Sequence, residues 1–158
     1  MLIKGIIAED FVNYKLPCMV IEFPICKDFK CDKEYGQKIC QNSHLANCPN
    51  YDIPYSNIVK FYLTNTIIQA ICYQGLDPMD SAEDVIQLTK LFRDYTNDSI
   101  IIWTGYNENE IEHLVQILKH YKNIVIKFGR YIPNQPSHYD EVLGVTLASP
   151  NQYDKKIS

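Results

Sequence analysis

The sequence predicts an α/β protein whose sheet is mostly parallel. Between residues 56 and 128, short apolar runs rich in β-branched residues alternate with segments whose apolar residues recur at helical spacing. Such an alternation indicates βαβ units with right-handed crossovers. The apolar runs lack a polar alternation, which indicates strands buried on both faces, as in parallel sheets. We expect one domain over residues 1–158, a length at which a single core is common.

Six apolar runs are the expected strands. Residues 2–8 form an expected edge strand, and residues 19–23 form the first interior strand, which Pro24 ends. The later expected strands are bounded by glycine or polar residues and cover residues 67–73, 99–103, 124–128 and 142–148. Residues 151–158 are polar, and we expect them to form a loose tail.

Three expected helices connect these strands. Ser81 is a suitable N-cap for the second helix, and Asn107 with Glu110 resembles a capping box at the start of the third. The first helix begins near Ser56, and its expected apolar face consists of Ile58, Val59, Tyr62 and Leu63.

Residues 24–48 form an expected loop that differs from the rest of the chain. Cys26, Cys31 and Cys40 lie there among charged and amide residues, with no apolar periodicity. Three thiols on one irregular loop, directly after the carboxyl end of a strand, suit a metal or an iron–sulfur centre. The alternative is that they are buried cysteines that pack like small hydrophobic residues. Core cysteines usually occur in apolar segments, as Cys72 does, and we expect Cys72 and Cys18 to be structural.

The composition excludes some classes of partner. The net charge is −4 and the basic residues are dispersed, so we expect no nucleic-acid partner. No apolar run approaches the ~20 residues of a membrane span, and we expect no membrane partner. The first ten residues turn acidic without a signal-peptide cleavage site. Six cysteines in such a chain indicate a reducing compartment, and we expect a cytoplasmic protein.

The loops that follow the carboxyl ends of the expected parallel strands should meet at one rim, because ligands of parallel α/β folds bind there. These loops are the cysteine loop and residues 74–78, 104–106 and 129–130. Their glycines let the backbone approach a ligand closely, and Asp77 offers a carboxylate to an ammonium group or a metal. The sequence therefore predicts a ligand site that combines three thiols, glycines and one carboxylate.

Five segments resemble, in their order, the motifs of a known family: residues 40–43 (CQNS), 75–78 (GLDP), 103–106 (WTGY), 128–131 (FGRY) and 148–152 (ASPNQ). The family is that of the radical S-adenosylmethionine (SAM) proteins, of the small type that activates anaerobic ribonucleotide reductase. The chain departs from its pattern at three places. Four residues separate Cys26 from Cys31 and eight separate Cys31 from Cys40, where the family has three and then two. Ile39 replaces an aromatic residue that touches adenine, and Leu76 replaces a glycine.

The resemblance implies an incomplete (βα) barrel and two cofactors, a [4Fe–4S] cluster and SAM. Cys26, Cys31 and Cys40 would ligate three irons, and SAM would chelate the fourth. In the SAM site, Asp77 and the Gly75 backbone would hold the ammonium group. The other family positions of that site are occupied by Ile39, Asn42, Leu76, Thr104, Lys127 and Arg130. Of these, Thr104, Lys127 or Arg130 would hold the ribose or the carboxylate, with no order among them.

The resemblance also implies an activity and two partners. An electron from a donor such as flavodoxin or ferredoxin would reduce the cluster, and cleavage of SAM would give a 5′-deoxyadenosyl radical. That radical would take a hydrogen atom from a backbone glycine of a glycyl-radical enzyme, the large subunit of anaerobic ribonucleotide reductase. Two alternatives remain open. One is a radical SAM enzyme that acts on another polypeptide. The other is a non-catalytic interaction module that binds zinc through the loop cysteines and Cys48, with His44 as a further candidate ligand.

Overall fold

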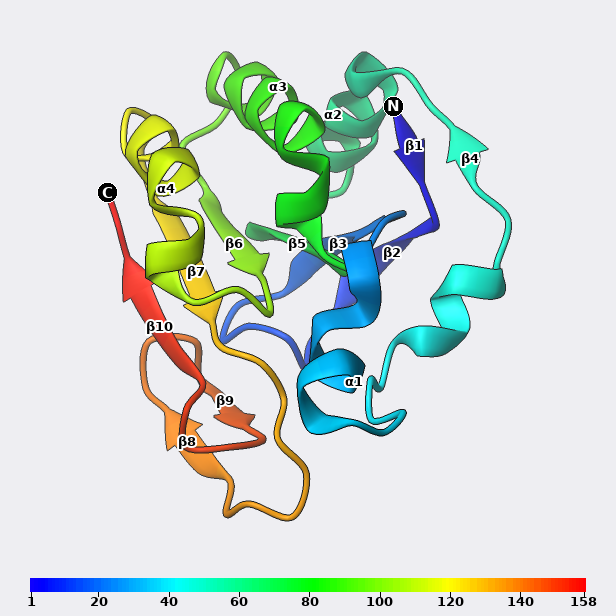
Figure 1. Cartoon of the computed structure of the whole chain (residues 1–158). Helices are drawn as coiled ribbons and strands as arrows, with labels where there is room; N and C mark the ends of the chain where they lie inside the picture. The colour runs from blue at the N-terminus through cyan, green and yellow to red at the C-terminus, as the bar shows by residue number, and fades with distance from the viewer.

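The computed structural model describes residues 1–158, and its centre is a six-stranded sheet of order β10-β7-β6-β5-β3-β2 (Figure 1). The four central strands are parallel, and the two edge strands, β2 and β10, are antiparallel to their neighbours. This confirms the prediction of an α/β protein with a mostly parallel sheet. In sheet order from one edge, the strands are β2 (Gly5–Asp10), β3 (Cys18–Phe23), β5 (Ala70–Gly75), β6 (Ser99–Trp103), β7 (Ile124–Phe128) and β10 (Tyr153–Lys156).

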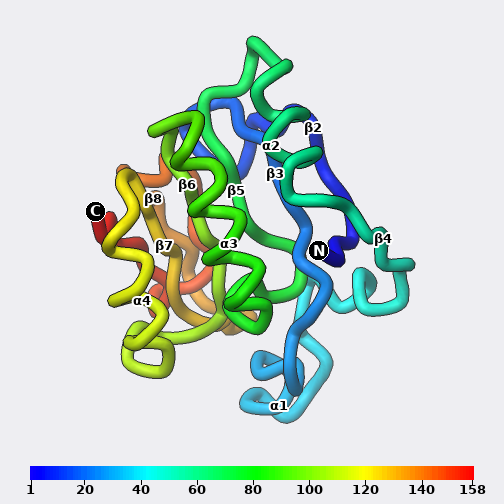
Figure 2. The backbone as a smooth tube through the Cα atoms, turned by 90° about the horizontal axis from the view of Figure 1, so that it is seen from above, coloured from blue at the N-terminus to red at the C-terminus, as the bar shows by residue number.

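Three helices cover one face of the sheet, and each connects two neighbouring parallel strands (Figures 1 and 2). They are α2 (Tyr55–Thr64), α3 (Ala82–Arg93) and α4 (Glu112–Leu118). Their buried side chains join the sheet residues of this face in a core of 23 buried residues. Because these three helices lie on the same face, strands are added in one direction only, from β3 to β7.

The other face of the sheet carries no helix. A smaller core of nine buried residues covers it, among them Val20, Cys72, Ile101 and Val125 from the four parallel strands. The cover comes from Tyr14 before β3 and from a hairpin of β8 (His138–Asp140) and β9 (Val145–Leu147). This cover lies over the amino-terminal half of the parallel strands. A cleft lies at their carboxyl ends, which the cover does not reach.

The cysteine segment is not the irregular loop that was predicted. A 3-10 turn, η1 (Lys27–Phe29), leads into a short helix, α1 (Lys30–Tyr35), and Cys31 lies on that helix. None of the residues of α1 is buried. The prediction failed here because a helix without a buried face has no apolar periodicity in its sequence.

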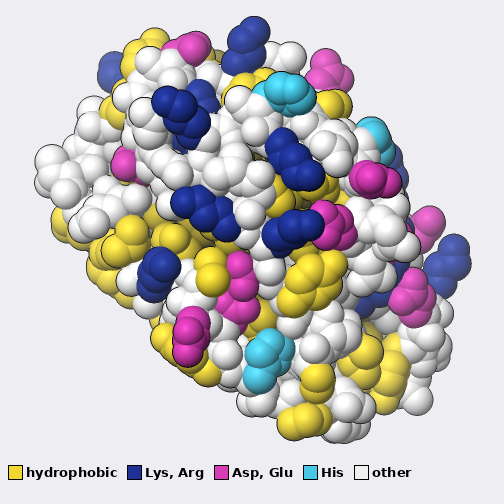
Figure 3. Space-filling model, turned by 90° about the vertical axis from the view of Figure 1, so that its left-hand side faces the viewer, with side chains coloured by type: hydrophobic (Ala, Val, Ile, Leu, Met, Phe, Trp, Pro, Cys, Tyr) yellow, Lys and Arg dark blue, Asp and Glu magenta, His cyan; other side chains and the backbone are white.

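The expected loose tail is also wrong. Residues 153–156 form β10, which pairs with β7, and Ile157 continues with a backbone hydrogen bond to Ile124. An edge strand packs little of its surface, so its residues can be charged, and lysines at an edge oppose pairing with another chain. Figure 3 shows the side of the molecule that carries α4 and β10, where Lys and Arg side chains gather. One of the edge lysines, Lys155, forms an ion pair of 2.7 Å with Glu108.

Smaller differences concern the bounds of elements. The expected strand 2–8 is divided into β1 (Leu2–Ile3) and β2, because β1 pairs with β4 (Tyr51–Asp52). The expected strand 67–73 is shifted to β5, and the strand 142–148 is shortened to β9. The predicted capping box of Asn107 and Glu110 is present, whereas the Ser81 hydroxyl caps nothing.

The remaining elements are the 3-10 turns η2 (Ser43–Asn47), η3 (Pro78–Ser81) and η4 (Glu108–Glu110). None of the helices has the length and apolar character that a bilayer crossing demands.

Candidate functional site

A cleft of about 420 Å³ opens at the carboxyl ends of the four parallel strands. Most of the residues that the sequence suggested for a site line it: Cys26, Cys31, Cys40, Asn42, Gly75, Leu76, Asp77, Thr104 and Lys127. Two do not. Ile39 lies outside the lining, and Arg130 lines a neighbouring pocket of about 260 Å³ that shares Cys31 and Tyr131 with the cleft.

Asp32 holds the backbone of the segment between Cys31 and Cys40 in place. Its Oδ1 atom accepts hydrogen bonds from the backbone N–H groups of Ile39, at 2.8 Å, and of Cys40, at 2.7 Å. The helix α1 ends at Gly36, and the chain then turns back toward its own start. The Asp32 carboxylate, next to Cys31, therefore fixes the backbone at Cys40, across the eight residues that separate the two cysteines.

Each loop cysteine has a backbone N–H group directed at its sulfur. The N–H of Lys30 lowers the pKa of Cys26, that of Tyr131 lowers the pKa of Cys31, and those of Asn42 and Ser43 lower the pKa of Cys40. Burial nevertheless raises the pKa of all three thiols, that of Cys26 to about 12, where Asp77 and Asp80 add to the effect. Without a cation in the cleft these thiols stay protonated at neutral pH, whereas metal coordination deprotonates a thiol.

The three thiols of the cleft are the groups that could hold a metal ion or an iron–sulfur cluster. Hydrogen bonds to the sulfurs and half-buried thiolates are typical of iron–sulfur sites, in which each thiolate binds a different iron. Three thiols also leave one iron of a four-iron cluster without a protein ligand. Cys48, the fourth cysteine of the segment, is exposed and does not line the cleft.

Asp77 joins two loops of the rim. Its carboxylate accepts hydrogen bonds from the Met79 N–H at 3.1 Å, from the Thr104 hydroxyl at 2.8 Å and from the Gly105 N–H at 3.0 Å. Burial raises the pKa of Asp77 to about 6, although these hydrogen bonds oppose the shift. The carboxylate that the sequence assigned to an ammonium group is thus already held by the protein, in a place where a nearby positive charge would stabilise it.

Gly75 and Asn42 connect the cysteine loop to the end of β5. Gly75 has a φ of +97°, and a Cβ atom there would lie 2.7 Å from the backbone nitrogen of Phe23. Only glycine fits such a close approach of two neighbouring strands. The Asn42 side chain donates a hydrogen bond of 2.7 Å to the Gly75 carbonyl oxygen. The segment after Cys40 is therefore anchored to the rim.

Lys127 extends from β7 into the cleft but is occupied by carbonyl groups. Its Nζ atom donates to the carbonyl oxygens of Gly129, at 2.8 Å, and of Thr104, at 3.4 Å. Burial lowers the pKa of Lys127 to about 8, against the opposing effects of Asp77 and Cys31. The ammonium group remains the one buried cation that faces the cleft.

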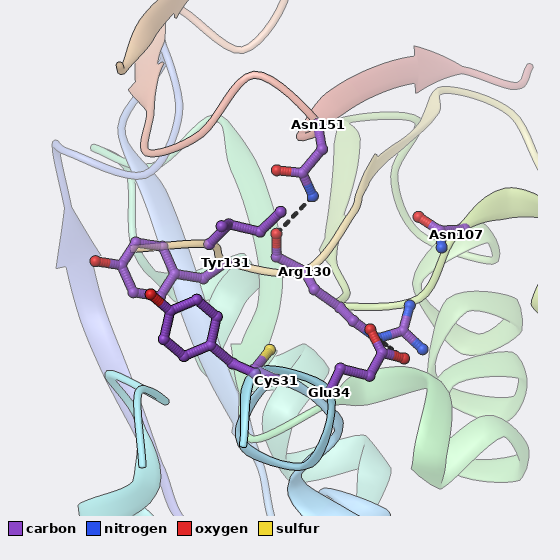
Figure 4. A pocket seen from close by; sticks show the side chains of 8 residues that line it. Cys31, Glu34, Asn107, Arg130, Tyr131 and Asn151 are labelled. Atoms are coloured by element: carbon purple, nitrogen blue, oxygen red, sulfur yellow. Dashed lines mark hydrogen bonds and ion pairs between the residues drawn. The ribbon is translucent and has the colours of Figure 1, made fainter. Parts of the chain in front are cut away.

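Arg130 is held by two carboxylates, and Figure 4 shows one of them, Glu34, beside it in the neighbouring pocket. Its two terminal nitrogens pair with Glu110, each at 2.7 Å, and its Nε atom lies 2.9 Å from Glu34 on α1. The hydrogen bonds of Arg130 lower the pKa of Glu110 to about 2. Arg130 therefore connects the cysteine helix to the end of β7, and the structure does not direct it into the cleft.

Several residues that position the site were not found from the sequence. Besides Asp32 and Glu34, Asp80 accepts hydrogen bonds from the Lys27 N–H at 2.7 Å and from the Tyr106 hydroxyl at 2.6 Å. Acidic residues are common in polar loops, and no spacing marks those that fold back on the backbone. The position of Asp32 directly after Cys31 is the only signal that the sequence offers.

No family model, no characterised protein and no solved structure matches the chain. What the protein does has to be inferred from its residues and their geometry.

Proposed function

We propose that the protein is a [4Fe–4S]- and SAM-dependent activating enzyme, which generates a glycyl radical on a partner such as anaerobic ribonucleotide reductase. Its sheet would then be an incomplete (βα) barrel of the radical SAM type. The observation that carries the proposal is the convergence of Cys26, Cys31 and Cys40 in one cleft at the carboxyl ends of four parallel strands, each with a backbone N–H at its sulfur.

The three cysteines would hold the cluster, and the rim between Gly75 and Thr104 would hold SAM. When bound, these groups supply reductive cleavage of the sulfonium and removal of a hydrogen atom from a substrate. The protein contributes position and exclusion of water. Asp77 is 6% exposed and lines the cleft, so the positive charge of an ammonium group would offset the burial that raises its pKa. Thr104 donates to that same carboxylate and orients it.

The helix-free side of the cleft supports a macromolecular substrate. The helices α2, α3 and α4 cover the opposite face of the sheet. On the helix-free face the β8–β9 hairpin covers only the amino-terminal half of the strands, and the cleft at their carboxyl ends extends to residues such as Val145 and Leu147. A segment of another polypeptide can reach the cleft from this side without displacing a helix. The same openness would be a disadvantage for a small substrate that has to be enclosed.

The decisive test is anaerobic reconstitution with iron and sulfide, followed by metal analysis and visible spectra with and without SAM. We expect about four irons per chain and a spectrum that changes when SAM is added to the reduced protein. Cys26→Ala, Cys31→Ala and Cys40→Ala should each abolish iron binding. Cys48→Ala is the matched control, because Cys48 lies in the same segment but outside the cleft. One tightly bound zinc and no iron would contradict the proposal.

A zinc-binding interaction module is the second candidate, and one observation favours it. His44 lines the cleft together with the three cysteines, and three cysteines with one histidine form a common structural zinc site. The two candidates respond differently to His44→Ala. Loss of metal in this variant would indicate zinc, whereas a cluster held by three thiols would keep its iron.

A further inference from the structure

The short helix α1, which carries Cys31, is not anchored in either core of the protein. None of the residues of η1 and α1 is buried, and none of them belongs to the two clusters of buried apolar side chains. Helices of globular proteins are stabilised mainly by an apolar face that packs on a core. A segment without such a face can open while the rest of the protein stays folded.

The backbone on both sides of α1 is left-handed. Before the helix, Asp28 and Phe29 have φ values of +66° and +42°, and after it Gly36 has a φ of +74°. Residues with a side chain are strained in this region, and the strain persists only where surrounding contacts hold the conformation. Opening of α1 would release the strain at Asp28 and Phe29, so these two residues have the properties of a hinge.

Two contacts hold α1 against the rim of the cleft. Glu34 lies 2.9 Å from Nε of Arg130, and the Lys30 ammonium group lies 3.1 Å from the centre of the Tyr106 ring. Lys30 and Glu34 are four residues apart, so they lie on the same face of the helix. Arg130 and Tyr106 are themselves bonded to carboxylates of the rim and stay in place. The Glu34 side chain is 60% exposed, so water can replace its contact.

Two of the three loop thiols lie on the segment that can open. Cys31 is part of α1, and the carboxylate of Asp32 accepts a hydrogen bond of 2.7 Å from the backbone N–H of Cys40. These two cysteines would therefore move together. Cys26 lies before the hinge, and the backbone N–H of the next residue, Lys27, is bonded to a carboxylate of the rim at 2.7 Å.

Opening of α1 would change access to the cleft. Cys31 lines both the cleft of about 420 Å³ and the neighbouring pocket of about 260 Å³ (Figure 4). Its sulfur also lies close to the rim, because a Cβ atom at Gly105 would be 3.8 Å from it. An outward movement of α1 would take this sulfur off the rim and join the two cavities into one opening.

We propose that residues 30–41 form a flap that turns about residues 28–29. The contacts with Arg130 and Tyr106 hold the flap closed, and its opening admits the metal centre to the cleft. The identity of the group that enters rests on the proposed function. The motion itself does not, because it is a property of the metal-free protein.

The test uses the full metal-free protein, kept reduced. Mass spectrometry follows the alkylation of each loop cysteine by iodoacetamide, and hydrogen exchange of the α1 amides reports opening independently of the thiols. Glu34→Gln removes an ion pair that only the closed flap makes. We expect alkylation of Cys31 and Cys40, and exchange in α1, to become faster by about fivefold. Cys26, which lies outside the flap, should react at an unchanged rate.

Lys33→Gln is the matched control. Lys33 is exposed on the same helix and takes part in none of the ion pairs of the protein, so its replacement should change neither rate. Lys30→Gln removes the contact with the Tyr106 ring and should have a smaller effect than Glu34→Gln, of about threefold. Sodium chloride at about 0.5 M should speed up exchange in the wild-type protein and have little effect on Glu34→Gln.

Entry to the cleft is followed with cobalt(II), which thiolates bind with a change in absorbance. Glu34→Gln destabilises the closed flap with and without metal. It should therefore speed up both the uptake of cobalt and its release to a chelator by about fivefold, while the affinity changes by less than about twofold. A residue that ligates the metal would change the affinity instead.

Several results would overturn the proposal: unchanged exchange in Glu34→Gln, faster alkylation confined to Cys31, an equal effect of Lys33→Gln, or unchanged rates of cobalt uptake and release. Faster exchange and faster cobalt uptake in a protein that never takes up iron would keep the flap and reject the radical chemistry. Iron uptake by a protein whose α1 exchanges no faster in Glu34→Gln would do the reverse. The two proposals can therefore fail separately.

Discussion

The protein places five of its six cysteines in two environments that differ in almost every physical respect. Cys18 and Cys72 lie on neighbouring parallel strands, are fully buried, and have their sulfurs 3.2 Å apart, with Asp10 at 3.7 Å from Cys18. The loop cysteines, Cys26, Cys31 and Cys40, are only partly buried and have charged neighbours. The thiols of Cys18 and Cys72 contact each other within the core, whereas the loop thiols face a cleft.

This difference shows that burial and availability for chemistry are separate properties of a thiol. Burial, followed by the contact with Cys18, raises the pKa of Cys72 well above its usual value, and no backbone N–H is directed at its sulfur. Such a thiol is inert and packs as a small hydrophobic residue. The loop thiols also have raised pKa values, but they have donors that can stabilise a thiolate once a cation arrives.

The largest expected effect comes from Gly75→Ala, which would break the rim on which the loop thiols depend. A Cβ atom would meet the backbone of Glu22 and Phe23, and the residue has a positive φ. We expect a loss of about 3 kcal/mol of unfolding free energy, measured by urea denaturation. Gly36→Ala is the matched control. It also has a positive φ but open space around it, and should cost about 1 kcal/mol. Equal losses would show that the close approach has no cost.

The rim should also respond to pH, because burial raises the pKa of Asp77 to about 6. The folded state then binds a proton more strongly than the unfolded state, so the contribution of Asp77 to stability is greatest below pH ~4 and falls as the pH rises through 6, by about 3 kcal/mol in the metal-free protein. Urea denaturation at a series of pH values measures this. Asp77→Asn should flatten the dependence in this window. The lowered pKa of Glu110, about 2, acts at lower pH and with the opposite sign.

Asp32→Asn should loosen the segment of backbone that carries Cys40. Its carboxylate accepts two backbone hydrogen bonds, and we expect a cost of about 2 kcal/mol, which falls on the loop rather than on the core. Cys40 should become more reactive toward iodoacetamide in the metal-free protein, and reconstituted iron should be lost faster. Asp28→Asn is the control in the same segment. An unchanged rate of alkylation at Cys40 would contradict a positioning role for Asp32.

The smallest expected changes in stability come from replacing one cysteine of each group by alanine. Cys72→Ala should cost about 1 kcal/mol, because it leaves a small cavity in a closed core, and iron binding should be unchanged. Cys40→Ala should change the stability of the metal-free protein by less than about 0.5 kcal/mol while abolishing iron binding. Urea denaturation and iron analysis of both variants give the answer. Equal changes in stability and in iron binding in the two variants would contradict the distinction between the two groups of cysteines.

The sequence predicted the parts of the fold that depend on buried apolar runs. β6 and β7 were predicted to the residue, and the three helices on the covered face followed from apolar periodicity and caps. The start of β5 was placed too early because Ile67 is apolar, yet it is 48% exposed. The helix α1 and the strand β10 were missed because neither has a buried side that the sequence could show.

The candidate site was predictable as far as topology determines it. Parallel strands bring their carboxyl ends together, so the loop cysteines and Asp77 could be placed at one rim from their order alone. The hydrogen bonds of Asp32 and the two carboxylates on Arg130 could not be predicted, because they depend on how the loops turn back.

The passage of the chain over Gly129 has a consequence for how the protein is made. A Cβ atom at this glycine would lie 2.5 Å from the Asn151 carbonyl oxygen, and the Asn151 side chain bonds to Arg130. One wall of the site thus comes from the opposite end of the sequence to the cysteines. During translation the thiols emerge from the ribosome early, and they stay without this wall until β10 has been synthesised and paired. If the cleft holds the proposed cofactor, its wall is complete only after the last strand has been synthesised and paired with β7.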